Sequence, residues 1–200
     1  DYFASLIKLN PALGAISANQ MNQLDPLFKF GMGSLFLDQK KNMMAIYERI
    51  LGKYISESQT FETIEIKGPD VGSMTSFMDS HGTIWFGGWA YVTKFDPKTL
   101  TNKKLTAFTQ SNVHSFLEDS SHNLWIGSTA GLTRYNLTTG KLDLFTNQRD
   151  DPQSLSNNTV YHVIMDNDKN IWVGTGGGLN KMIKGTESDV PRFLNWRTTQ

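Results

Sequence analysis

The sequence contains no cysteine, which excludes disulfide bonds, thiolate catalysis and cysteine-ligated metals. It also has no excess of charge, because 19 basic residues balance 19 acidic ones, and it therefore offers no basic stripe for nucleic acid. No apolar run reaches the roughly 20 residues that a membrane helix needs. Residues 1–5 lack the basic-then-apolar pattern of a secretion signal, so we expect either a cytosolic chain or one whose signal has been removed.

A short motif recurs along the 200 residues, of which 38% are apolar and 12% aromatic. An Asp is followed six residues later by Trp, and that Trp is followed two residues later by Gly. The three copies are Asp79, Trp85 and Gly87; Asp119, Trp125 and Gly127; and Asp166, Trp172 and Gly174. Such self-similarity predicts a repeat architecture.

The period of the repeat is 40 residues from Asp79 to Asp119 and 47 residues from Asp119 to Asp166. The seven extra residues fall in the polar stretch 147–158, which indicates a loop insertion. One period upstream, Asp38 begins a degenerate copy in which Met44 stands in place of Trp.

The register holds beyond the motif. An apolar residue stands two positions before each Asp, at Phe36, Phe77, Leu117 and Ile164. Nine and ten positions after each Trp or its substitute come a basic and then a large apolar residue: Lys53 and Tyr54, Lys94 and Phe95, Arg134 and Tyr135, Lys181 and Met182. This agreement favours a true repeat over a chance match.

Within one repeat we predict four short strands separated by turn-forming residues, at 113–118, 124–127, 132–135 and 142–145. Four antiparallel strands per repeat of this length predict an all-β fold, a β-propeller. The blades fall at about 32–66, 73–108, 113–145 and 160–196, with 1–31 as the end of a preceding blade. Since propellers have roughly 4 to 8 blades, we expect these about four and a half blades to form one open segment of a larger ring.

The motif residues are assigned structural roles. The Asp side chain is expected to accept backbone N–H bonds in the turn between the first two strands, while the Gly allows close backbone approach. The Trp side chains are expected to be buried between neighbouring blades.

The pattern Asp-x-x-x-Asn-Ile/Leu-Trp-Ile/Val-Gly-Ser/Thr, the following Gly-Leu-x-Arg/Lys-Tyr-Asn and the loop 149–158 resemble the two-component regulator propeller repeat. The resemblance is close over 72–182. It implies a seven-bladed ring in the periplasmic, extracytoplasmic sensor of Bacteroides-type hybrid histidine kinases, which are inner-membrane proteins. Binding residues vary within that family, so the resemblance implies none for this chain.

Other chemical interpretations are weaker. Residues 166–170 mimic the start of a calcium loop, but Ile171 and Gly177 stand where a turn glycine and a bidentate Glu are needed. The histidines His81, His114, His122 and His162 lack metal-ligand spacing, and we expect them to be solvated or hydrogen-bonded. We therefore predict no catalytic residue, no metal site and no cofactor, and a segment that is not an enzyme.

Ligands of propellers usually bind at the end that carries the hairpins between second and third strands and the links between blades. There we expect Trp89, Tyr91, Arg149 and Asp150, and an exposed aromatic beside polar groups suits a sugar or another flat polar ligand. In the alternative, Trp89 covers a gap in a neighbouring blade.

Three functions stay open. The first is an extracytoplasmic sensor in which a glycan or its breakdown product shifts how paired propellers meet. The second is a protein interaction platform, which contacts the rest of its own polypeptide or a homodimer partner through propeller edges. The third is a lyase or hydrolase on a propeller scaffold.

Overall fold

The computed structural model of the chain describes residues 33–47, 49–58, 60–67, 74–108, 110–183 and 190–197. The predicted end of a preceding blade, 1–31, lies outside the described residues. The described part contains four four-stranded antiparallel sheets and a single-turn 3₁₀ helix, η3 (Thr106–Phe108). No helix among these residues is long and apolar enough to cross a bilayer.

Each sheet contains four strands that are consecutive in the chain, so each sheet is one blade. Blade 1 contains β1 (Ser34–Leu37), β2 (Met43–Tyr47), β3 (Ile50–Ile55) and β4 (Thr60–Glu65). Blade 2 contains β5 (Thr75–Met78), β6 (Ile84–Gly88), β7 (Tyr91–Asp96) and β8 (Thr101–Leu105). Blade 3 contains β9 (Val113–Glu118), β10 (Asn123–Ser128), β11 (Gly131–Asn136) and β12 (Leu142–Phe145). Blade 4 contains β13 (Val160–Met165), β14 (Ile171–Thr175), β15 (Gly178–Ile183) and β16 (Arg192–Arg197).

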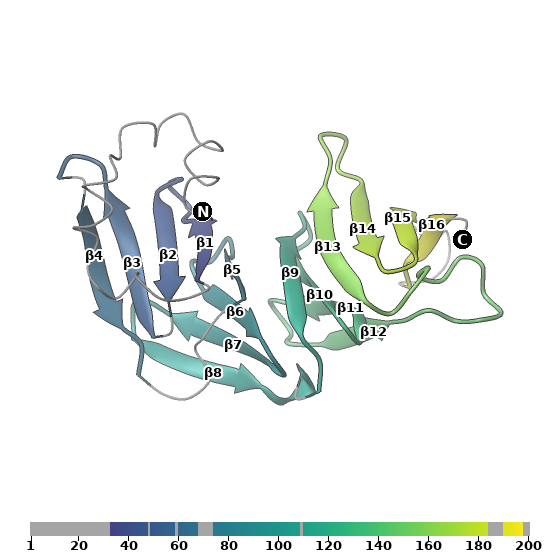
Figure 1. Cartoon of the computed structure of the whole chain (residues 1–200), viewed down its shortest axis with the longest axis horizontal. Helices are drawn as coiled ribbons and strands as arrows, with labels where there is room; N and C mark the ends of the chain where they lie inside the picture. Colours follow the sequence, from purple (N-terminus) through teal and green to yellow (C-terminus); the bar gives the residue numbers. More distant parts are fainter. Residues whose placement is uncertain are drawn as a thin grey trace.

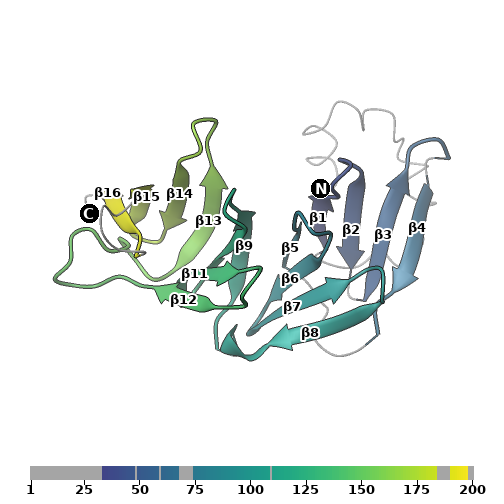
Figure 2. The ribbon, with the colours of Figure 1, turned by 180° about the vertical axis from the view of Figure 1, so that it is seen from behind.

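The first strands of successive blades lie side by side: β1 contacts β5, β5 contacts β9, and β9 contacts β13. Figures 1 and 2 show blade 1 and blade 4 at the two ends of an open arc. The prediction of a partial, all-β propeller is therefore confirmed. In blade 3 the predicted strands agree with the observed ones to within one residue at each end.

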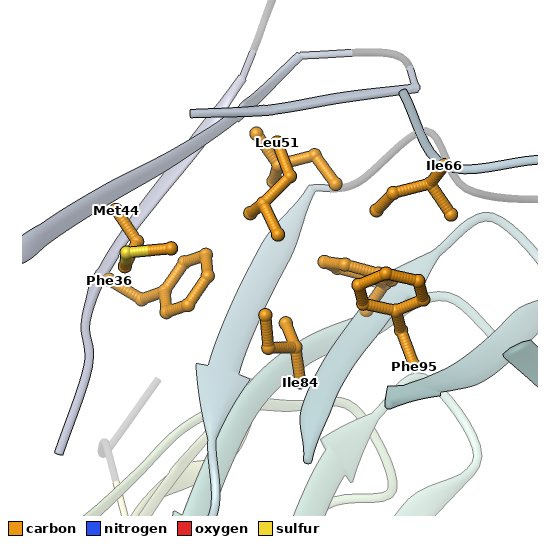
Figure 3. Packing of buried hydrophobic residues seen from close by; sticks show 8 residues of the cluster. Phe36, Met44, Leu51, Ile66, Ile84 and Phe95 are labelled. Carbon is orange, nitrogen blue, oxygen red and sulfur yellow. The ribbon is translucent and has the colours of Figure 1, made fainter. Parts of the chain in front are cut away.

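A cluster of buried side chains joins blade 1 to blade 2 (Figure 3). Phe36 and Met44 of blade 1 face Ile84 and Phe95 of blade 2 in this cluster. Met44, which replaces the Trp of the other repeats, is only 7% exposed. The degenerate repeat thus keeps an apolar residue at the blade interface, where a flexible thioether fills the space of an indole.

The Trp position of the repeat, which Met44 occupies in blade 1, also joins the later blades. Trp85 of blade 2 packs edge-on against Tyr135 of blade 3, with 5.3 Å between the ring centroids. Trp125 of blade 3 lies in one cluster with Met182 of blade 4. The large apolar residue ten positions after each Trp thus packs at the interface with the preceding blade, where that blade places its Trp or Met44.

In the three repeats that contain Trp, the Asp side chain accepts a hydrogen bond from the indole of its own repeat. In blade 2, Asp79 accepts the backbone N–H groups of His81 and Thr83 through Oδ1, each at 2.9 Å. Its Oδ2 accepts the indole N–H of Trp85 at 2.8 Å. The predicted turn role is thus confirmed, and the indole bond, which we did not predict from the sequence, explains the constant spacing of six residues.

In blade 4 the same carboxylate is strongly favoured in its charged form. The indole N–H of Trp172 and the side-chain amide of Asn170 donate to Asp166 at 2.8 Å each. These two donors, with the backbone N–H of Asn170, lower the pKa of Asp166 from 3.8 to about 2.

The expectation that all three Trp side chains are buried is wrong for Trp172. Trp85 and Trp125 are 1% and 3% exposed, whereas Trp172 is only half-buried. The physical reason is that no described blade follows blade 4. One face of the Trp172 ring is instead covered by the Nζ of Lys181, 5.3 Å from the ring centroid, and Trp196 lies beside it.

The glycine after each Trp lies where the next blade comes closest. A Cβ on Gly127 would stand 2.7 Å from a methyl carbon of Val160 on β13, a distance too short for two carbons. A Cβ on Gly174 would meet no described atom nearer than 3.9 Å. The predicted role in close approach therefore holds at Gly127 and has no counterpart at Gly174.

Replacing Gly127 by Ala should lower the free energy of unfolding by about 1–3 kcal/mol, because the added methyl group overpacks the blade interface. The matched variant Gly174→Ala should leave stability unchanged or raise it by about 0.4–1 kcal/mol, because alanine restricts the unfolded chain. Urea unfolding of both variants measures the difference. Equal losses would contradict a role in blade packing.

Candidate functional site

The two ends of the blades carry different connections. At one end, here called the hairpin end, lie the turns between the second and third strands together with the links between blades. Hydrogen bonds tie these two kinds of segment together, from Thr129 N to Asn112 O at 3.0 Å and from Gly176 N to Thr159 O at 2.9 Å. The opposite end carries the turns that begin with the repeat Asp and is here called the Asp-turn end.

Trp89 lies at the tip of the β6–β7 hairpin, at the hairpin end of blade 2. Its side chain is 68% exposed. An indole that filled a gap in a neighbouring blade would be buried. The next residue, Ala90, completes the two-residue turn with φ +62°, a left-handed conformation.

Tyr91 begins β7 beside Trp89 and is partly exposed, in the place predicted from the sequence. Its ring lies against Gly88, where any Cβ would collide with it. The Nζ of Lys104 on β8 lies 5.6 Å from the centre of the Tyr91 ring. Trp89, Tyr91 and Lys104 therefore give blade 2 an aromatic surface with one cation at the hairpin end.

Arg149 and Asp150 are exposed on the link between β12 and β13. The rest of this link is anchored: Leu155 is fully buried, and Asp151 forms an ion pair with Arg192 of β16 at 3.1 Å. The insertion is therefore fixed by its own packing. Trp89 belongs to a different blade, and a site shared by Trp89 and Arg149 stays a prediction.

A second group of polar side chains gathers at the Asp-turn end, between blades 2 and 3. His81, Glu118 and His122 each offer one potential ligand atom, and these three atoms lie within 4.8 Å of one another. We did not predict this group from the sequence, because His81 and His122 are 41 residues apart. A usable signal exists: both histidines belong to equivalent Asp turns, and the propeller places equivalent turns of successive blades side by side.

Comparison with known proteins supports the repeat assignment. Residues 107–130 and 154–177 match the family model described as two component regulator propeller. The first stretch includes all of β9 and β10, and the second includes the last part of the anchored link together with all of β13 and β14. No curated protein sequence matches the chain.

Several solved structures have a similar fold. The extracellular domain of a Bacteroides thetaiotaomicron protein, described as a putative hybrid two component system, is 23% identical with a TM-score of 0.64. The alignment covers 76% of this chain and 21% of that one, so the chain spans about a fifth of its relative. Virginiamycin B lyase from Staphylococcus aureus is 15% identical with a TM-score of 0.61, over 85% of this chain and 58% of the lyase.

These likenesses to solved structures establish the fold, and the family match establishes the type of repeat. Neither comparison identifies a ligand for this chain. Residues 107–130 and 154–177 are two-component regulator propeller repeats, carried by a partial β-propeller.

Proposed function

We propose that this chain is part of the periplasmic sensor of a hybrid two-component signalling system, and that a glycan or its breakdown product binds at the hairpin end. The observation that carries this proposal is the match of residues 107–130 and 154–177 to the two component regulator propeller family. The fold shared with an extracellular domain from Bacteroides thetaiotaomicron supports it.

The chemistry of blade 2 supports a sugar as the ligand. Trp89 is the most exposed of the large hydrophobic side chains among the described residues, at 68%. Sugar rings present flat C–H faces that pack on an indole, while their hydroxyl groups need donors and acceptors such as Lys104 and Arg149. We propose that this segment binds its ligand without transforming it, since an exposed aromatic surface supplies affinity but no acid, base or nucleophile.

Replacing Trp89 by Ala should weaken glycan binding about five- to thirtyfold while leaving the thermal midpoint within a degree or two. The indole contacts solvent, and its loss therefore removes a binding surface of about 1–2 kcal/mol without opening a cavity. Binding is measured on an array of oligosaccharides and then by calorimetry with whichever glycan binds the wild-type protein.

The matched control is Leu100→Ala, which removes an exposed apolar side chain from the opposite end of the same blade. It should leave both binding and the thermal midpoint unchanged. A fall of several degrees for Trp89→Ala with binding retained would remove Trp89 from the site. A wild-type protein that binds no glycan on the array would contradict the ligand class.

A second candidate, contact between propeller segments, rests on the free face of blade 4. In blade 3 the paired residues Leu132 and Phe145 pack against blade 4. Their counterparts in blade 4, the paired residues Leu179 and Trp196, are 43% and 51% exposed. A blade of the same kind would cover this face, and we propose that a second copy of the chain supplies it through blade 1 where no further blade of the same polypeptide does.

Replacing Leu179 by Glu should therefore convert a self-associating chain into a monomer, because burying a carboxylate in an apolar interface is unfavourable. Light scattering during size-exclusion chromatography measures the mass of each variant. Leu100→Glu adds the same charge away from this face and should remain associated. A wild-type chain that is monomeric at all concentrations would contradict the contact.

A further inference from the structure

Glu118 is held at the junction of blades 2 and 3 in a defined orientation. The backbone N–H of Ser80 donates to its Oε2 and the hydroxyl of Ser80 donates to its Oε1, both at 2.6 Å. Its side chain is only 10% exposed. A carboxylate has about four acceptor positions, so these two bonds leave Oε1 able to bind a further partner.

Two imidazoles lie beside this fixed carboxylate. The Nδ1 of His122 lies 3.3 Å from Glu118 Oε1, and the rings of His122 and His81 have centroids 5.4 Å apart. The side chain of His122 is 54% exposed and His81 is also exposed, so both rings are free to adjust. The group therefore combines one rigid ligand with two adaptable ones.

These distances fit a transition-metal ion. Zinc binds imidazole and carboxylate donors at about 2.0–2.1 Å, which places donors of a tetrahedral site about 3.3 Å apart. The pair His122 Nδ1 and Glu118 Oε1 already has this separation. The remaining donor lies within 4.8 Å and needs only a small movement of the exposed His81 side chain. Imidazole donors select zinc, nickel or copper over magnesium or calcium.

We propose that His81, Glu118 and His122 bind a divalent transition-metal ion, with zinc as the representative, and that the ion links blade 2 to blade 3. His81 comes from blade 2, whereas Glu118 and His122 come from blade 3. Ser80 orients the carboxylate of Glu118, as groups that hydrogen-bond to metal ligands commonly do. Three protein ligands leave the fourth position open to water or to a ligand.

The site is independent of the glycan site. It lies at the Asp-turn end, opposite to Trp89, and departs from our expectation that the histidines are only solvated or hydrogen-bonded. A protein that binds zinc but no glycan would support the metal site alone, so the two proposals fail separately.

The test is calorimetric titration of zinc chloride into chain that has been stripped with EDTA and dialysed. We expect saturable binding of one zinc ion and a rise of the thermal midpoint with zinc. His81→Gln and His122→Asn should each weaken binding at least tenfold. Asn suits position 122, where the backbone has φ +56°. Ser80→Ala should weaken binding about tenfold, in the range found when outer partners of metal ligands are removed.

The matched control is His162→Gln, which removes another exposed histidine, on β13, and should bind zinc like the wild type. Thermal unfolding in EDTA shows whether each variant is folded. If His122→Asn does not fold, the variant His81→Gln, which changes an exposed turn residue, is sufficient for the test. X-ray absorption at the zinc edge should show two imidazole ligands.

Absence of saturable zinc binding by the wild type would overturn the proposal. Equal loss of affinity in His162→Gln and His81→Gln would also overturn it, because the ion would then bind histidines unselectively. Wild-type affinity in both His81→Gln and His122→Asn would place the ion elsewhere.

Discussion

Replacing Trp125 by Ala should lower the free energy of unfolding by about 3–5 kcal/mol, the usual cost of removing a large buried aromatic side chain. The indole is 3% exposed and lies in the cluster that joins blades 3 and 4, together with Leu132 and Met182. Its loss leaves a cavity in a sheet interface that cannot close. Urea unfolding monitored by circular dichroism measures the change.

The chain contains its own control for this experiment. Trp172 occupies the equivalent place in blade 4 and makes the same 2.8 Å indole bond to the Asp of its repeat, but it is only half-buried. Trp172→Ala should therefore cost about 1–2 kcal/mol, since less apolar surface returns to water. Equal costs would mean that the Trp stabilises its own blade and contributes nothing between blades.

Replacing Asp79 by Ala should lower the free energy of unfolding by about 2–4 kcal/mol, because the carboxylate makes three hydrogen bonds and each bond to a charged group is worth about 1.5–3 kcal/mol before partial replacement by water. Asp79 is 2% exposed, so the indole N–H of Trp85 would lose its partner in a buried site. The measurement is again urea unfolding.

The degenerate repeat provides a comparison without the indole bond. Asp38 accepts the backbone N–H groups of Lys40 and Asn42, each at 2.8 Å, and the side-chain amide of Asn42 at 2.7 Å, but Met44 offers it no indole. Asp38→Ala should consequently cost about 1–2 kcal/mol, the value of turn bonds that water can partly replace. A cost at Asp38 as large as that at Asp79 would show that the turn alone accounts for the effect.

The repeat pattern was sufficient for the blade architecture. The spacing of Asp119 and Trp125, and the turn-forming residues within 113–145, predicted the strands of blade 3 to within one residue at each end. Local rules suffice here because a hairpin depends on its turn residues and on which side chains alternate between faces. The open arc also followed from the number of repeats.

The constant spacing of six residues is the signal in the sequence for the bond from Asp79 to Trp85. The half-buried state of Trp172 could not be deduced from its repeat. Burial depends on the neighbouring blade, and identical motifs therefore differ in exposure according to whether another blade packs against them.

Tertiary structure alone brought His81 to Glu118 and His122, because their approach depends on how blades 2 and 3 are set side by side. It likewise decided that the Trp89 side chain is exposed at the tip of its hairpin, because burial depends on what packs against that turn. Sequence determines which residues each turn presents, through hydrogen bonding and side-chain alternation over a few residues. The angle and spacing between blades, which arise from packing across whole sheets, decide which of those turns meet.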